Sequence, residues 1–141
     1  MSFRQSTEKD FNFVFELNKI NMKKYVETIR GWDENNERGD MKKKFTPGID
    51  QIIQVGGKDA GVLRVLETEE SIKLDHIELL PEFQSRGIGG EIIKDLISKN
   101  KPVSLQVLKQ NPAVELYKTL GFEIVGETDL KYKMLCNSKK S

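Results

Sequence analysis

Hydrophobic residues recur at intervals of three and four along the first part of the chain. Between residues 11 and 29 the positions at this spacing are Phe11, Val14, Phe15, Asn18, Met22, Tyr25, Val26 and Ile29, all apolar or aromatic except Asn18. A period of about 3.6 residues predicts one long amphipathic helix, which runs to Arg30 and stops at Gly31. Thr7 and Asp10 precede this helix with the spacing of a capping box, although Asp stands where Glu or Gln is usual.

Elsewhere, short apolar runs are bounded by glycine, proline and charged residues, which predicts strands. The expected elements, in chain order, are a strand at 2–5, the long helix, a shorter helix ending near Phe45, strands at 49–55 and 60–66 joined by a hairpin turn at 56–59, a strand at 73–80, a helix after the glycines that follow Pro81, a strand at 103–108, a short helix ending at Gly121, and strands at 123–126 and 131–135. Helices and strands mixed in this way predict an α/β fold.

Composition narrows the class of protein. The chain has 141 residues, which fits one domain, and its 23 Lys and Arg nearly balance its 22 Asp and Glu. A near-neutral charge gives no electrostatic reason to expect nucleic acid or an anionic membrane as a partner. The N-terminal segment has no uninterrupted apolar run, so we expect a cytoplasmic protein. One cysteine and one histidine make neither a disulfide nor a structural zinc site, so no metal is expected.

A glycine-rich turn follows the strand at 73–80. Gly87, Gly89 and Gly90 stand where the next helix begins, and glycine leaves no side chain between the main-chain amides and a ligand. Amides at a helix N-terminus lack intrahelical partners and carry a partial positive charge. The turn therefore suits a phosphate or pyrophosphate, although a tight turn without a ligand explains the same glycines.

The turn does not fit the common nucleotide motifs. No Lys-Ser or Lys-Thr follows the glycines, as a P-loop requires, and the glycine spacing fails the dinucleotide fingerprint. A nucleotide-binding switch is therefore disfavoured. The segment Gln84-Ser85-Arg86-Gly87-Ile88-Gly89 resembles instead the acyl-CoA signature Q/R-x-x-G-x-G/A of the GNAT superfamily of N-acetyltransferases.

A second segment strengthens this resemblance. Downstream, the chain reads NPAVELYKTLGF from Asn111 to Phe122, which is similar to the other GNAT marker, N-x-x-A/V-x-x-L/F-Y-x-x-x-G-F. Asn111 as a cap, Pro112 at the first helical position and Gly121 as a stop delimit a short helix on physical grounds alone. Without the glycine loop upstream, Tyr117 on this helix is better explained as a core aromatic.

The resemblance implies a fold and a coenzyme. We expect a single GNAT domain at 1–136 with a tail at 137–141, containing a mixed, mostly antiparallel sheet of about six or seven strands and about four flanking helices, with splayed middle strands. Acetyl-CoA is the implied co-substrate. Its pantetheine would meet the backbone of Ile77 and Leu79. The residues implied around the rest of the coenzyme are Gln84, Arg86, Gly87, Ile88, Gly89, Gly90, Asn111 and Tyr117.

The implied reaction transfers an acetyl group to a primary amine of a small molecule or peptide. Tyr117 is the implied general acid. The general base is expected to be Asp75, with Glu78 as the next choice, whereas the lone histidine, His76, is more typical of a structural residue.

Tyr25 and Trp32, near the carboxylates of Asp33, Glu34 and Glu37, would suit a cationic acceptor, unless Tyr25 simply packs in the core. Two alternatives stay open: a non-catalytic acyl-CoA-binding module, and an enzyme that acetylates protein lysines or N-termini. The protein is expected to be a monomer or a homodimer.

Overall fold

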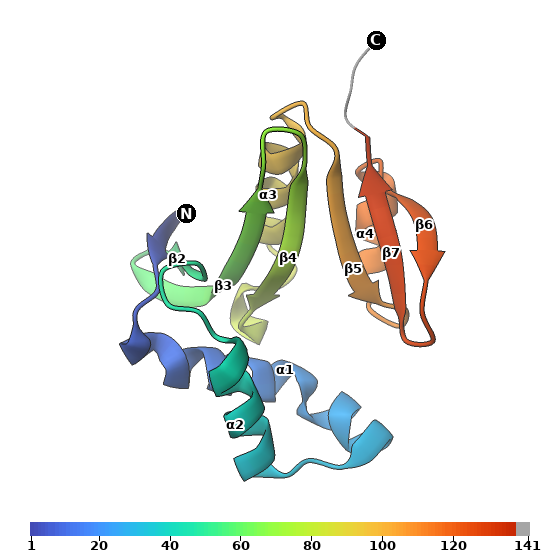
Figure 1. The fold of residues 1–141 in the computed structure, drawn as a ribbon. Helices are drawn as coiled ribbons and strands as arrows, with labels where there is room; N and C mark the ends of the chain where they lie inside the picture. The colour runs from blue at the N-terminus through green and yellow to red at the C-terminus, as the bar shows by residue number, and fades with distance from the viewer. Residues whose placement is uncertain (138–141) are drawn as a thin grey trace. The chain divides into compact units, whose positions relative to one another are not determined.

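The computed structural model describes residues 1–137, so the expected tail lies almost entirely outside the described residues. The elements in chain order are β1 (Ser2–Gln5), the 3-10 turn η1 (Glu8–Asp10), α1 (Phe11–Arg30), α2 (Glu34–Lys44), β2 (Gln51–Val55), β3 (Lys58–Glu67), β4 (Ile72–Leu79), the 3-10 turn η2 (Pro81–Phe83), α3 (Ile88–Ile97), β5 (Val103–Leu108), α4 (Ala113–Thr119), β6 (Glu123–Glu127) and β7 (Lys131–Cys136) (Figure 1). The predicted order of helices and strands is confirmed.

The strands form a seven-stranded sheet in the order β1-β2-β3-β4-β5-β7-β6. The described pairs are antiparallel except β4 with β5, so the expected mixed, mostly antiparallel sheet is confirmed. The parallel ladder joins Ile72, Lys73 and Leu74 to Val103, Ser104 and Leu105. This described ladder covers the first three residues of β4.

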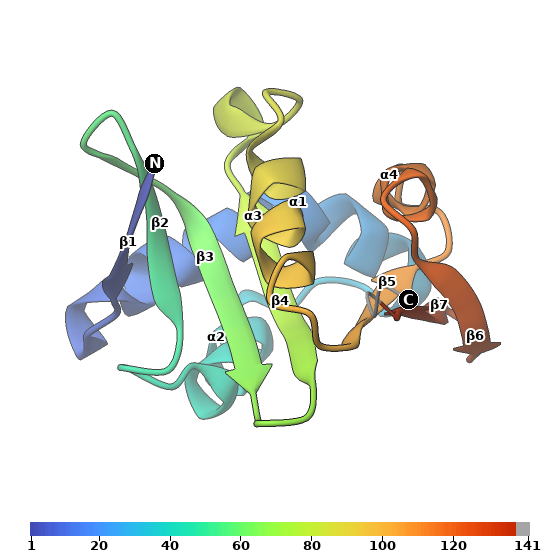
Figure 2. The same ribbon diagram turned by 90° about the horizontal axis from the view of Figure 1, so that it is seen from above.

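The chain divides into two compact units. The first comprises residues 1–64 with 76–84, and the second comprises 65–75 with the chain from residue 85 onward. In the first unit, Val14 and Leu17 of α1 pack with Ile52 and Val62 of the sheet, and Met41, Phe45, Phe13 and Leu80 cover this cluster. Figure 2 shows α1 running beneath the strands of this unit.

The long amphipathic helix α1 has the predicted length, but only part of its apolar face is buried. Its buried residues, Phe11, Val14, Phe15 and Leu17, all lie in its first half, and Ile29 near its end is 48% exposed. Asn18, which falls at an apolar spacing, makes a polar contact described below.

The second unit has its own apolar core. One face of α3 buries Ile88, Ile92, Ile93 and Leu96, and β5 buries every second residue, Val103, Leu105 and Val107. Strand β5 pairs with β7 along its whole length, and β7 also pairs with β6. Helix α4 covers one face of this part of the sheet (Figures 1 and 2).

The β2–β3 hairpin is tighter than predicted. Gly56 and Gly57 form a two-residue turn, and β3 begins at Lys58 instead of residue 60. Both glycines have positive φ, 59° and 80°, which is the conformation of the hairpin turn that best matches strand twist. The expected four-residue turn was wrong because Lys58 and Asp59 have low strand propensity but sit at the end of a paired ladder.

The predicted capping box is present, and it caps the turn η1 that leads directly into α1. Asp10 Oδ2 accepts a hydrogen bond from Thr7 N at 2.8 Å, and the two terminal nitrogens of Arg4 donate to Asp10 at 2.8 and 3.0 Å. The hydrogen bonds from Arg4 lower the pKa of the buried Asp10 carboxyl more than burial raises it.

We expect Asp10→Asn to lower the free energy of unfolding by about 1–3 kcal/mol near neutral pH, because a buried charged partner of Arg4 is lost. A carboxyl with a lowered folded-state pKa stabilises the protein above its unfolded pKa of about 3.9 and loses this contribution as the pH falls through the folded value. Urea unfolding at several pH values checks this. The difference in free energy of unfolding between wild type and variant should narrow below about pH 4. A difference that stays constant with pH would contradict the ionised pair.

Candidate active site

The glycine loop between η2 and α3 exposes backbone amides. Gly87, the residue before α3, has a left-handed φ of 80°, and Ser85 is also left-handed at 61°. The first described bond within the helix runs from Glu91 N to Gly87 O at 3.0 Å. The amides of Ile88, Gly89 and Gly90 therefore lie in the first turn, ahead of any helical carbonyl partner.

Glycine stands at the three positions of this loop for different physical reasons. Gly87 requires glycine because of its positive φ. Gly89 and Gly90 are not among the residues with positive φ, and a Cβ at either would meet no atom within 4 Å. Glycine inside a helix costs about 0.5–1 kcal/mol relative to alanine. The fold itself therefore does not need glycine at Gly89 or Gly90. Glycine at such positions is expected where a ligand must come close to the backbone.

The other predicted loop residues differ in which of their groups are available to a ligand. The Ile88 side chain is buried in the core, so only its backbone is available to a ligand. Arg86 is exposed on the loop. The Gln84 side chain instead donates to Leu79 O at 2.9 Å and to Asn21 Oδ1 at 3.2 Å. The structure thus groups Gln84 with α1 and the end of β4, and the same bond occupies the Leu79 carbonyl that was expected to meet pantetheine.

Helix α4 holds Tyr117 in an apolar setting. Asn111 Oδ1 accepts a hydrogen bond from Ala113 N, the first helical amide, at 2.9 Å. The N-cap residue itself is Pro112, one position later than predicted. The Tyr117 ring is 7% exposed and lies 5.8 Å from the Phe122 ring, centroid to centroid. Burial raises the pKa of its phenol, which stays protonated at neutral pH. No hydrogen bond within residues 1–137 occupies this hydroxyl, which leaves it available to donate.

Glu78 lies in a polar cluster of the first unit. Its Oε1 accepts from Asn18 Nδ2 at 3.1 Å and lies 2.7 Å from His76 Nε2, and its Oε2 accepts from Asn21 Nδ2 at 3.2 Å. Its side chain is 11% exposed. Burial raises the pKa of this carboxyl, but the hydrogen bonds from His76 and the two asparagines, with the charge that His76 carries when it is protonated, outweigh burial and lower the pKa below its ordinary value.

Asp75, the first-choice base, has a different environment. It is an exposed residue of β4, and its carboxylate forms an ion pair with Lys73 at 3.4 Å. The alternation of buried and exposed side chains along β4 breaks after Asp75, because the residues from His76 to Leu79 are all partly buried. Glu78 is therefore the more buried of the two β4 carboxylates, with a side chain that is 11% exposed against 30% for Asp75.

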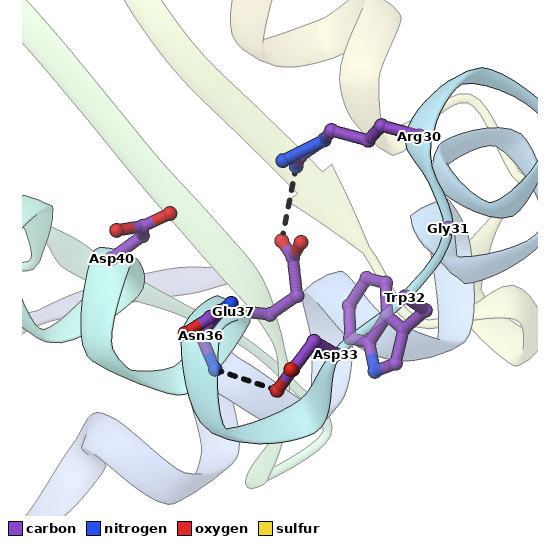
Figure 3. Close-up of a pocket in the computed structure, with 7 residues that line it drawn as sticks. All are labelled: Arg30, Gly31, Trp32, Asp33, Asn36, Glu37 and Asp40. Carbon is purple, nitrogen blue, oxygen red and sulfur yellow. Dashed lines mark hydrogen bonds and ion pairs between the residues drawn. The ribbon is translucent and has the colours of Figure 1, made fainter.

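Of the two residues predicted to bind the acceptor, Trp32 lines a described cavity, and Tyr25 is not among the residues that line it. The cavity has a volume of about 590 Å³ and is lined by Arg30, Gly31, Trp32, Asp33, Asn36, Glu37 and Asp40 (Figure 3). Glu37 pairs with Arg30 at 3.1 Å, and Asp33 caps α2 through Asn36 N. The Tyr25 hydroxyl is buried, with no hydrogen-bond partner in the described part of the chain.

Sequence reasoning missed three residues of the Glu78 cluster. Asn18 and Asn21 belong to α1, and the available signal was a polar residue at the apolar spacing of a helix. Gly61 of β3 is the third. A Cβ there would lie 2.1 Å from Glu78 O, so β3 and β4 approach each other too closely for any other residue. An isolated glycine within a strand is the corresponding signal.

Comparison with known proteins defines the class. The sequence matches the family described as acetyltransferase (GNAT) domain over residues 25–133. The chain therefore belongs to the GNAT acetyltransferase family, and the sequence-based recognition is confirmed.

A search of curated proteins finds no match. Among the described residues, no helix is both long and apolar enough to span a membrane, and no group of three or more potential ligands could hold a metal ion.

Solved structures share the fold at low identity. PaiA N-acetyltransferase from Thermoplasma acidophilum, in complex with coenzyme A, is 16% identical, with a TM-score of 0.70 over 96% of this chain and 97% of that one. An N-acetyltransferase from Staphylococcus aureus Mu50 is 14% identical, with a TM-score of 0.72 over 96% and 100%. The ribosomal-protein-S18-alanine N-acetyltransferase from Escherichia coli is 17% identical, with a TM-score of 0.62 over 99% and 95%.

Proposed function

We propose that this protein transfers the acetyl group of acetyl-CoA to a primary amine of a small molecule or peptide. The observation that carries the proposal is the pair Gly89 and Gly90, which neither backbone conformation nor packing within the chain requires. A pyrophosphate resting on the first-turn amides of α3 does require open space there. Membership of the GNAT family and the coenzyme A in the Thermoplasma relative support this assignment.

The proposed chemistry is direct transfer. The amine nitrogen attacks the thioester carbonyl carbon, an N–C bond forms and the C–S bond breaks. Tyr117 donates its phenolic proton to the departing sulfur, and a group on β4 accepts the proton lost by the amine. The phenolate regains a proton from solvent, and the products are an amide and free coenzyme A. Asp75 and Glu78 are the two predicted carboxylate acceptors on β4.

The acceptor class is inferred from the cavity beside Trp32. Its lining carries the carboxylates of Asp33, Glu37 and Asp40 against the single guanidinium of Arg30, which favours a cationic amine over an anionic one. The Escherichia coli relative is named for an alanine of a ribosomal protein, which is a peptide acceptor. A peptide N-terminus is therefore the second candidate acceptor. A peptide panel beside a panel of small amines separates the two by coenzyme A release.

We expect Gly89→Glu to have opposite effects on stability and on coenzyme binding. The GNAT loop signature admits alanine at this position, so a larger, charged residue is the stronger test. Glutamate favours a helix and its N-terminal dipole, which should raise the midpoint of thermal unfolding without ligand. The same side chain should place a negative charge against the pyrophosphate and weaken acetyl-CoA binding by about tenfold or more. Unfolding midpoints with increasing acetyl-CoA measure both quantities.

Gly39→Glu is the matched control. Gly39 lies within α2, and a Cβ there also meets no atom within 4 Å. This variant adds the same charge and a similar gain in helix propensity, but it should keep the full acetyl-CoA shift. If wild type shows no shift at about 1 mM acetyl-CoA, the proposed function is wrong. If Gly89→Glu binds as tightly as the control, the pyrophosphate does not lie at this turn.

A further inference from the structure

Both oxygens of the Glu78 carboxylate already accept hydrogen bonds. Asn18 and His76 contact Oε1 at 3.1 and 2.7 Å, and Asn21 contacts Oε2 at 3.2 Å. Backbone packing also fixes the residue, because the Glu78 carbonyl lies against Gly61. A buried, ionised carboxylate with this many donors is stabilised in its charged form and is correspondingly reluctant to take a proton. Glu78 is therefore a poor proton acceptor but a good anchor.

His76 has the complementary properties. Its side chain is 40% exposed, and its Nε2 points to Glu78 Oε1. An imidazole that donates through Nε2 to a carboxylate carries its lone pair on Nδ1, because a neutral ring has one N–H and one acceptor nitrogen. The acceptor nitrogen of a neutral imidazole can take up a proton, which is what a general base must do.

We propose that His76 is the general base of the acetyl transfer and that Glu78 is a positioning residue that fixes its tautomer. This inference rests on the proposed function. As the amine attacks the thioester, its proton passes to His76 Nδ1, and the imidazolium so formed is paired with the Glu78 carboxylate. The C–S bond breaks and the sulfur takes the Tyr117 proton, so that charge and protons balance. This role differs from the structural role that the sequence suggests for His76.

Among the described residues, Glu78 is a charged group in direct contact with His76, at 2.7 Å between Oε1 and Nε2. Glu78 is on the same strand, and α1 contributes only the neutral amides of Asn18 and Asn21 to the cluster. The nearby Asp75 carboxylate pairs with Lys73. This pattern resembles other sites where a carboxylate orients a histidine that transfers protons.

The first test needs no acceptor substrate. The chain has one histidine, so its imidazole signals require no assignment. Nitrogen-15 NMR of the ring at a pH above its titration should show the proton on Nε2 in wild type, and Glu78→Gln should lose this preference. Asp75→Asn is the control and should leave the tautomer unchanged. A wild-type ring protonated on Nδ1, or a tautomer that Glu78→Gln does not alter, would overturn the proposal.

The second test is a ratio of pH profiles. With any amine that wild type acetylates, the ratio of wild-type to His76→Gln kcat/KM cancels the ionisation of the acceptor itself. We expect a loss of about 10²–10³-fold at neutral pH, and a ratio that falls toward unity at acid pH, where a protonated imidazole can accept no further proton. Glu78→Asp keeps a carboxylate. It should retain a higher kcat/KM, and a pH dependence of kcat/KM closer to that of wild type, than Glu78→Gln.

A flat ratio near unity from pH 5 to 9 would show that His76 is not the base. If the fall in kcat/KM on the acid side persists in His76→Gln and lies below pH 5, the general base is a carboxylate. Failure of the proposed function is distinguishable, because wild type would then neither bind acetyl-CoA nor release free thiol with any amine.

Discussion

Replacing Tyr117 by phenylalanine is expected to lower kcat by about 10²–10⁴-fold, the usual contribution of a positioned general acid. Affinity for acetyl-CoA should change little. The variant keeps the aromatic ring that packs on Phe122 and loses only a hydroxyl that makes no hydrogen bond within residues 1–137. Stability should therefore be unchanged or slightly raised, since no partner is left unsatisfied. Free-thiol release and the thermal shift with acetyl-CoA measure the two effects separately.

The alkaline limb of the rate supplies a further check on Tyr117. Burial raises its pKa above the ordinary value of about 10, so the acid stays protonated across the neutral and mildly alkaline range. Wild-type kcat should decline only above about pH 10, and the residual rate of Tyr117→Phe should lack this decline. Tyr132→Phe, on the neighbouring strand β7, is the matched control. An unchanged kcat in Tyr117→Phe would remove the residue from the reaction.

The sequence was most informative where the structure depends on local backbone rules. Gly87 in a left-handed conformation, the Asn111 hydrogen bond to the first amide of α4 and the Thr7–Asp10 capping box all act over a few residues, so their spacing predicts them. The same local rules predicted the order of the elements. They failed at the β2–β3 hairpin because strand pairing there overrides the low propensity of Lys58 and Asp59.

The Glu78 cluster was less predictable because its contacts are distant in sequence. Asn18 and Glu78 are 60 residues apart, and nothing in either segment alone indicates that they meet. The preference for Asp75 relied on alternation along β4, and the burial pattern of that strand is regular only as far as Asp75. The role of Gly61 likewise depends on the close approach of a second strand, which a single sequence does not encode locally.

Replacing Gly61 by alanine is expected to be the most destabilising of these substitutions. The new Cβ would lie 2.1 Å from Glu78 O and 2.9 Å from Leu79 Cδ2, and the first of these atoms belongs to the backbone and cannot rotate away. Strand β4 would have to shift against β3, where Leu80 N bonds to Ala60 O at 2.9 Å. Overpacking of this kind costs about 1–3 kcal/mol or more, which urea unfolding would show as a lower midpoint.

The same shift should reach the proposed proton acceptor. Moving the Glu78 backbone alters the distances from its carboxylate to Asn18 and His76, so Gly61→Ala should also disturb the His76 ring tautomer measured by NMR. Gly126→Ala in β6 is the matched strand control, because its Cβ would meet Lys133 Cδ at an ordinary 3.6 Å. That variant should change stability by less than about 0.5 kcal/mol. If Gly61→Ala unfolds at the same midpoint as the control, β3 and β4 are not in this close contact, and the packing that holds Glu78 in place is absent.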